Sequence, residues 1–235
     1  MRVQAWKIAT IATMAALSVS GCSVLRGNGG PRTPTVGNRV PILTAQADVA
    51  VDATVAGLQV ILPDAIPNAD WGQSGGNAGK AMSHVSLGAT LSQAWTAQIP
   101  GGSTRARLAA APVISGGSLF AMDTEGTVHA YNAATGASLW TARVGSDDRH
   151  AQHARFGGGV SAEAGTVYAV TGLGDVAALD AATGASRWIV RPAGPLRGSP
   201  TLAFGNVFVI SQDNQIFALR ATDGNREWQE SGSVA

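Results

Sequence analysis

Ala130-Tyr-Asn-Ala-Ala-Thr-Gly136-Ala-Ser-Leu-Trp140 is an eleven-residue phrase that the chain repeats twice more with small changes. The later copies read Ala178-Leu-Asp-Ala-Ala-Thr-Gly184-Ala-Ser-Arg-Trp188 and Ala218-Leu-Arg-Ala-Thr-Asp-Gly224-Asn-Arg-Glu-Trp228. Trp140 lies 48 residues before Trp188 and 45 after Trp95, and Trp228 lies 40 after Trp188. These distances bracket the roughly 40 to 45 residues of a four-stranded propeller blade. The repeat therefore predicts an all-β chain built of propeller blades.

Each part of the phrase has a physical role. Asn132 or Asp180 can accept backbone N–H bonds at the start of a turn, and the glycine four residues later supplies a positive φ. Each tryptophan can dock on the neighbouring blade and bury about 150 to 250 Å² of surface. The residues predicted to form this Trp-docking repeat are Trp95, Trp140, Trp188 and Trp228 with Gly136, Gly184 and Gly224.

Short runs rich in β-branched and aromatic residues precede each tryptophan, such as Thr166-Val-Tyr-Ala-Val and Asn206-Val-Phe-Val-Ile. Runs of this kind, separated by Gly, Asp and Asn, are typical of antiparallel strands. We predict a partial β-propeller over 71–235, with a lone strand at Trp95. Its three four-stranded blades are expected at about 109–142, 157–190 and 199–230.

The amino end has a different character. Arg2 and Lys7 precede an apolar stretch that is too short to span a membrane and ends in Val19-Ser-Gly-Cys22. The stretch resembles a bacterial lipoprotein signal with its lipobox. The resemblance implies a signal peptide over 1–21, lipidation of Cys22, and anchoring at the periplasmic face of the outer membrane. The alternative is that this single cysteine is an unpaired or buried thiol.

Residues 22–39 combine the predicted lipidated Cys22 with a segment rich in Gly, Pro, Arg and Thr, which indicates a flexible tether. Its three arginines could contact anionic lipid or could simply be solvated. Residues 40–70 are more apolar, and we expect an extended segment that packs on the propeller rim. Without the signal, 14 basic residues face 15 acidic ones, so the charge disfavours nucleic acid as a partner.

Two stretches resemble the BamB family, the propeller lipoproteins of the outer-membrane β-barrel assembly (BAM) machinery. They are Asn68-Ala-Asp-Trp-Gly-Gln-Ser-Gly-Gly-Asn77 and Leu196-Arg-Gly-Ser-Pro200. The resemblance implies a non-catalytic periplasmic scaffold that binds the POTRA domains of BamA, other BAM components and nascent outer-membrane proteins. It places Leu196 and Arg197 on the partner-binding loop, with Leu196 as an apolar anchor and Arg197 as a hydrogen-bond fork. The alternative is that Leu196 packs in a blade and Arg197 is solvated.

The chain departs from the family in length. The family's propeller has eight blades, which require about 320 to 360 residues, whereas Trp95 to Ala235 provides 141. We therefore expect a truncated form of a longer product, and the alternative is a short propeller completed by self-association. An open arc would expose apolar blade faces.

Two other classes of function compete with the scaffold. A ligand-binding or sensor propeller of the envelope is the first alternative. A fragment of a pyrroloquinoline-quinone (PQQ) dehydrogenase comes third, because the family's cofactor platform is a disulfide of adjacent cysteines and only Cys22 is present. We expect no enzyme activity, no cofactor and no metal. Asp147, Asp148, His150 and His153 have the chemistry to bind zinc, but we favour a solvated loop for them, and Gly157-Gly158-Gly159 indicates a hinge or bulge.

Overall fold

The computed structural model describes residues 52–101, 110–145 and 157–232 of the chain. The predicted signal peptide, Cys22, the tether and the cluster from Asp147 to His153 lie outside these ranges. The chain divides into two compact units, Met1–Gln59 and Val60–Ala235. In the first unit the described part is a turn, where Oδ1 of Asp52 accepts hydrogen bonds from the backbone and the hydroxyl of Thr54. No described helix is long and apolar enough to cross a membrane.

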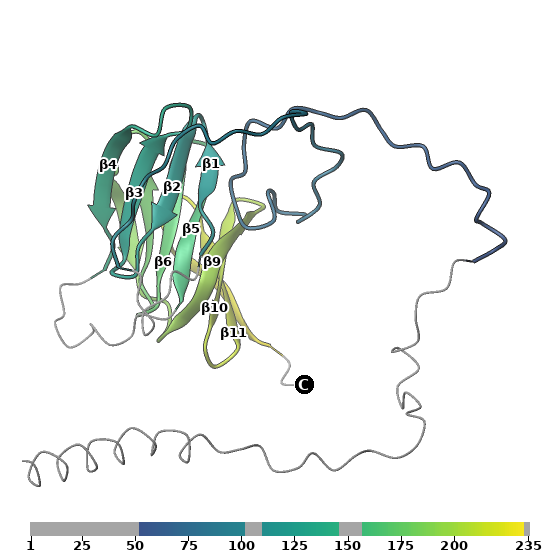
Figure 1. The fold of residues 1–235 in the computed structure, drawn as a ribbon. Coiled ribbons are helices and arrows are strands. Elements are labelled where there is room, and N and C mark those ends of the chain that lie inside the picture. Colours follow the sequence, from purple (N-terminus) through teal and green to yellow (C-terminus); the bar gives the residue numbers. More distant parts are fainter. Residues whose placement is uncertain (1–51, 102–109, 146–156, 233–235) are drawn as a thin grey trace, which may run out of the picture. The chain divides into compact units, whose positions relative to one another are not determined.

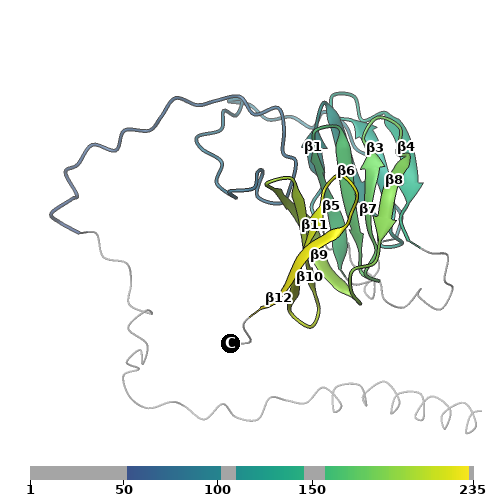
Figure 2. The same cartoon turned by 180° about the vertical axis from the view of Figure 1, so that it is seen from behind.

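The second unit contains three four-stranded antiparallel sheets, seen from two sides in Figures 1 and 2. Blade 1 consists of β1 (Val113–Ser115), β2 (Ser118–Met122), β3 (Thr127–Asn132) and β4 (Ser138–Arg143). Blade 2 consists of β5 (Gly158–Glu163), β6 (Thr166–Thr171), β7 (Val176–Asp180) and β8 (Ser186–Val190). Blade 3 consists of β9 (Leu196–Ala203), β10 (Asn206–Ser211), β11 (Gln215–Arg220) and β12 (Arg226–Ser231). The predicted all-β class and the three four-stranded sheets are confirmed.

Each sheet is a meander in which consecutive strands are hydrogen-bonded neighbours. The first strands of the blades, β1, β5 and β9, pack against one another, whereas the fourth strands lie at the exposed outer edge. The first two strands of each blade are joined by a tight turn with positive φ at both central residues, as in a type I′ hairpin. The lone strand predicted at Trp95 does not form, because residues 91–99 contain no strand.

Two hydrophobic clusters hold the blades together. The first joins blades 1 and 2 around Phe120, and the second joins blades 2 and 3 around Leu202. Both clusters are built from alternate residues of the inner strands, which is the pattern of sheets packed face to face. A fully buried Phe or Leu side chain contributes about 1.5 to 3 kcal/mol on transfer from water. The blades therefore form one stack rather than three independent sheets.

The three glycines at 157–159 start β5 between the neighbouring first strands. All three have positive φ. A Cβ at Gly158 would lie 2.3 Å from the carbonyl oxygen of Val170, and one at Gly159 would lie 2.2 Å from Oγ of Ser199. This run was expected to be a hinge or bulge. Gly157 and Gly158 instead allow a close approach of backbone to backbone, and Gly159 makes room for the side chain of Ser199.

Candidate interaction surface

The three docked tryptophans make the same contact at each step along the chain. Each indole Nε1–H donates to a backbone carbonyl oxygen of the next turn at 3.0 Å, in the pairs Trp95 to Ala133, Trp140 to Ala181 and Trp188 to Ala221. Each ring also covers the glycine three residues after that carbonyl. A Cβ at Gly136, Gly184 or Gly224 would lie 2.6 to 2.7 Å from a ring atom. The structure thus places three of the four predicted tryptophans on the three predicted glycines.

The turns that receive Trp95 and Trp140 are each held by the polar residue that opens them, Asn132 and Asp180. Oδ1 of Asp180 accepts hydrogen bonds from the backbone N–H groups of Ala182 and Thr183 and from the Thr183 hydroxyl. Arg187 donates to Oδ2 of the same carboxylate at 2.7 Å. Arg187 and then Thr183 lower the pKa of Asp180 from 3.8 to about 2. Asn132 makes the equivalent backbone bonds in blade 1, so the first copies of the phrase form the same rigid turn.

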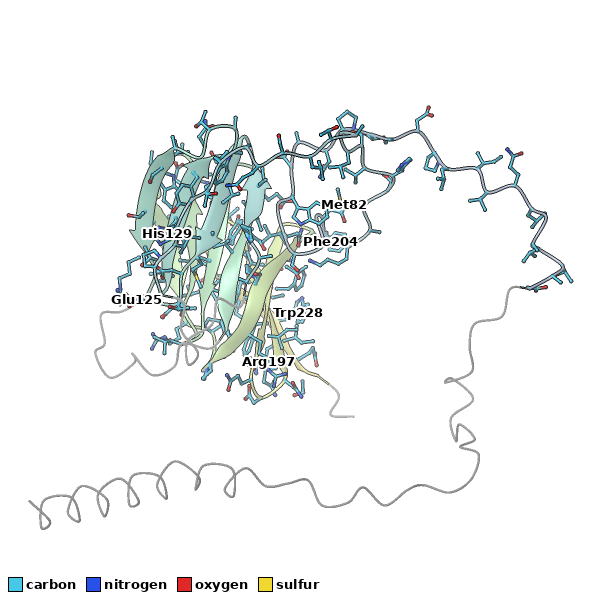
Figure 3. All side chains as sticks on the ribbon, viewed as in Figure 1. Met82, Glu125, His129, Arg197, Phe204 and Trp228 are labelled. Atoms are coloured by element: carbon cyan, nitrogen blue, oxygen red, sulfur yellow. The ribbon has the colours of Figure 1, made fainter. Side chains whose placement is uncertain are left out.

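Trp228 continues this series, but its surroundings differ. Its ring packs on Phe208 with centroids 5.7 Å apart and a 47° tilt, close to the 6.0 Å and 47° of Tyr168 and Trp188. However, Trp228 is 43% exposed, and Ile210, two residues after Phe208 on β10, is 44% exposed. Figure 3 shows Trp228 on the outer part of blade 3. This face of blade 3 is therefore a preformed apolar surface, and surfaces of this kind mark interaction sites.

Sequence analysis did not single out the residues beside Trp228. An alignment of the repeats could have found them, because Phe208 occupies the position of Phe120 in blade 1 and Tyr168 in blade 2. Those two side chains are buried against the following blade, whereas Phe208 is only partly buried. Periodicity identifies the equivalent positions, but burial depends on what packs against them.

The structure gives different environments to Leu196 and Arg197, which the family resemblance placed together on a partner-binding loop. Both are the first residues of β9 rather than loop residues, since they pair with Ser211 and Ile210 of β10 beyond a bulge in β9. Leu196 is fully buried in the second hydrophobic cluster, which corresponds to the packing alternative. It offers no apolar anchor on the surface of this structure.

Arg197 is exposed at the end of β9 that lies opposite the turn at Phe204 (Figure 3). Its Nη2 donates to the carbonyl oxygen of Gln212 at 2.6 Å, which holds the guanidinium over the turn between β10 and β11. A side chain held in one position loses less entropy when it binds. Arg197 is thus placed and oriented as a surface hydrogen-bond donor, and its binding to a partner stays a prediction.

The charged groups of the turns between second and third strands are paired within the blades. Asp123 accepts backbone hydrogen bonds through Oδ1, and its Oδ2 lies 2.9 Å from Nε2 of His129. Asp175, whose side chain is 7% exposed, forms a 2.7 Å ion pair with Arg191. In the described ranges no three His, Cys, Asp or Glu side chains are grouped as a metal site. These carboxylates hold turns in place.

The fold and the docked tryptophans define the class of protein as a β-propeller of the PQQ-like type. The family model described as outer membrane protein assembly factor BamB matches residues 43–156 and 124–235. The chain belongs to this PQQ-like, BamB-type propeller family. No curated protein matches the chain significantly.

One solved structure supports the propeller fold. A quinohemoprotein alcohol dehydrogenase from Comamonas testosteroni superposes with a TM-score of 0.58 at 24% identity over 71% of this chain. BamB from Moraxella catarrhalis gives a TM-score of 0.40 at 24% identity over 58% of this chain. The chain spans 28% of the length of the dehydrogenase and 40% of that of BamB. At these identities the first similarity shows the propeller fold alone.

Proposed function

We propose that this chain is a non-catalytic, lipid-anchored scaffold at the periplasmic face of the outer membrane. There it binds BamA and other components of the β-barrel assembly machinery and aids the insertion of outer-membrane proteins. The observation that carries the proposal is the match of the BamB-type family model, which extends through all three blades. Similarity to the alcohol dehydrogenase is a similarity of fold and adds no support for quinone chemistry.

Arg197 is the residue with which we test this function. Its guanidinium is exposed, held by Gln212, and free of any acidic partner among the contacts of the described residues. An oriented guanidinium can donate two parallel hydrogen bonds to a carboxylate of a partner. The contact with BamA is therefore expected to be a charge-assisted hydrogen bond at this end of blade 3.

The test is the binding of the lipidated full chain to the POTRA domains of BamA, measured by biolayer interferometry. Arg197→Ala is expected to weaken binding by about 10-fold or more, the range of an interface hot spot. Arg226→Ala is the matched control, because Arg226 is an exposed arginine of β12 that donates to Gln229. Its affinity should equal that of the wild type.

The two parts of the proposal fail in different ways. Absence of binding by the wild-type chain would overturn the scaffold function itself. Wild-type binding that Arg197→Ala and Arg226→Ala leave equally strong would keep the scaffold and move the contact away from Arg197. A loss of affinity in both variants would show a nonspecific effect of charge, which also contradicts the assigned role of Arg197.

A further inference from the structure

The segment Asp70–Gln73 runs across the first strands of all three blades. Trp71 exchanges two backbone hydrogen bonds with Ile114 of β1, at 2.7 and 2.9 Å. The carbonyl oxygen of Gly72 accepts a 2.7 Å bond from the N–H of Ala162 in β5. Gln73 contacts Leu202 of β9. Three consecutive residues thus bind three different blades.

The residues that receive this segment are equivalent in the repeat. In each blade the hairpin turn between the first two strands has glycine as its second central residue: Gly117, Gly165 and Gly205. The receiving residue lies three positions before this glycine, at Ile114, Ala162 and Leu202. Each belongs to the first strand of its blade, and this strand has no neighbouring strand on its free edge within the described sheets. Unpaired N–H and C=O groups at such an edge are available to an added strand. The repeat therefore creates a row of similar binding positions.

Gln73 extends the reach of the segment with its side chain. Its Nε2 donates to the carbonyl oxygen of Leu202 and its Oε1 accepts from the N–H of Leu202, both at 3.0 Å. The carboxamide thereby makes the two bonds that the N–H and C=O of one strand residue make in an antiparallel pair. Gln73 is 5% exposed, and Lys80 donates to the same Oε1 at 3.2 Å. A buried amide with its partners in place is a specific contact.

Gly72 permits the middle contact. A Cβ at this position would lie 2.4 Å from the carbonyl oxygen of Ala162, which is backbone and cannot rotate away. Asp70 adds a fourth contact, because its Oδ1 accepts a 2.8 Å bond from the N–H of Gly116 in the turn after β1. Each residue of Asp70–Gln73 therefore has its own hydrogen-bond partner on the blades.

We propose that Asp70–Gln73 is an axial clasp, an extended segment bound in cis by the row at Ile114, Ala162 and Leu202, which fixes the three blades relative to one another. The row is a strand-binding site, and the residue of the bound segment that lies against Ala162 must be glycine. While the clasp is in place, an extended segment of another protein has no access to these edge groups. Among the described strands, the outer strands β4, β8 and β12 keep a free edge for a partner strand.

Amide hydrogen exchange on the full chain tests the clasp. Gln73→Ala removes the bonds to Leu202 directly, so faster exchange at Leu202 alone would be a local effect. If the segment binds as one strand, the exchange of Ala162 and Ile114 should also accelerate, by at least about 10-fold. Gly72→Ala should accelerate the same three amides. Amides between β6 and β7, inside blade 2, should change much less.

Two matched controls lie in the same unit. Gly79→Ala places a Cβ 3.5 Å from its nearest neighbour, Oδ1 of Asn77, and Gln93→Ala removes an exposed glutamine that contacts only Thr96 in the described residues. Both should leave the three amides protected. Acceleration confined to the one amide that each clasp variant contacts would overturn the proposal, as would no acceleration at all. If Gly72→Ala fails to fold, the Gln73→Ala result decides by the same criterion.

Discussion

Replacement of Gly184 by alanine separates the effect of tryptophan docking from that of backbone conformation. Gly184 has φ +75°, and a Cβ there would lie 2.6 Å from the ring of Trp140. Gly165 has almost the same φ, +73°, with no atom within 4 Å of its added Cβ. Both glycines lie in turns of blade 2. Gly165→Ala is therefore a control that carries the same backbone cost without a clash.

The difference in unfolding free energy between the variants can be worked out from the contacts. A left-handed alanine costs about 1 to 2 kcal/mol at either position. Only Gly184→Ala displaces Trp140, whose Nε1–H then loses its 3.0 Å bond to Ala181, a loss of about 0.5 to 1.5 kcal/mol. Exposure of part of the ring adds about 1 to 2 kcal/mol. We expect Gly184→Ala to be less stable than Gly165→Ala by about 2 to 3 kcal/mol.

Urea denaturation followed by far-ultraviolet circular dichroism measures both values on the same chain. The combination of Gly184→Ala with Trp140→Ala should show strong coupling, since the clash disappears with the ring. Equal stabilities of the Gly184→Ala and Gly165→Ala variants would refute the reasoning. Such a result would mean that the ring does not rest on the glycine in solution.

The remaining predictions concern burial and pH. Phe120→Ala should destabilise the chain by about 3 to 5 kcal/mol because the ring is fully buried. Phe204 is 97% exposed in a turn, so Phe204→Ala should change stability by less than about 0.5 kcal/mol. Similar unfolding curves of the two variants would contradict the packing. The pKa of Asp180 is lowered to about 2, so its contribution to stability is present above its ordinary pKa of 3.8 and is lost as the pH falls toward 2. Arg187→Ala should raise the pKa of Asp180 toward 3.8, and a carbon-13 NMR titration of the carboxyl group measures this pKa. An unchanged titration midpoint would exclude Arg187 as the main cause of the lowered pKa.

Much of the fold could be predicted because its determinants are local. The turn opened by Asn132 or Asp180 and the glycine four residues later depend on a few neighbouring residues, and so do the short strands around them. The period of the tryptophans then implies blades, because a residue type that recurs at blade length must have a recurring environment. The same logic predicts the docking of Trp95, Trp140 and Trp188.

The candidate site could be predicted only in part. Leu196 and Arg197 are adjacent in the sequence and carry one family motif, yet one is buried and the other is exposed. The difference follows from the alternation of a strand, since consecutive side chains point to opposite faces. A loop was expected there, and a loop imposes no such alternation. The pairing extends to Leu196 across a bulge in β9 at residues 198–200, and it depends on the neighbouring strand β10.

The sequence by itself determined the repeating unit: its turns, its strands, its glycines and its tryptophans, all of which follow from interactions over a few residues or from periodicity. Tertiary structure alone decided which equivalent positions are covered, as the contrast between buried Phe120 and partly exposed Phe208 shows. It also decided that Gln73 bonds with Leu202, 129 residues away. Such contacts form between groups that the folded blades bring together, and no local pattern encodes their distance.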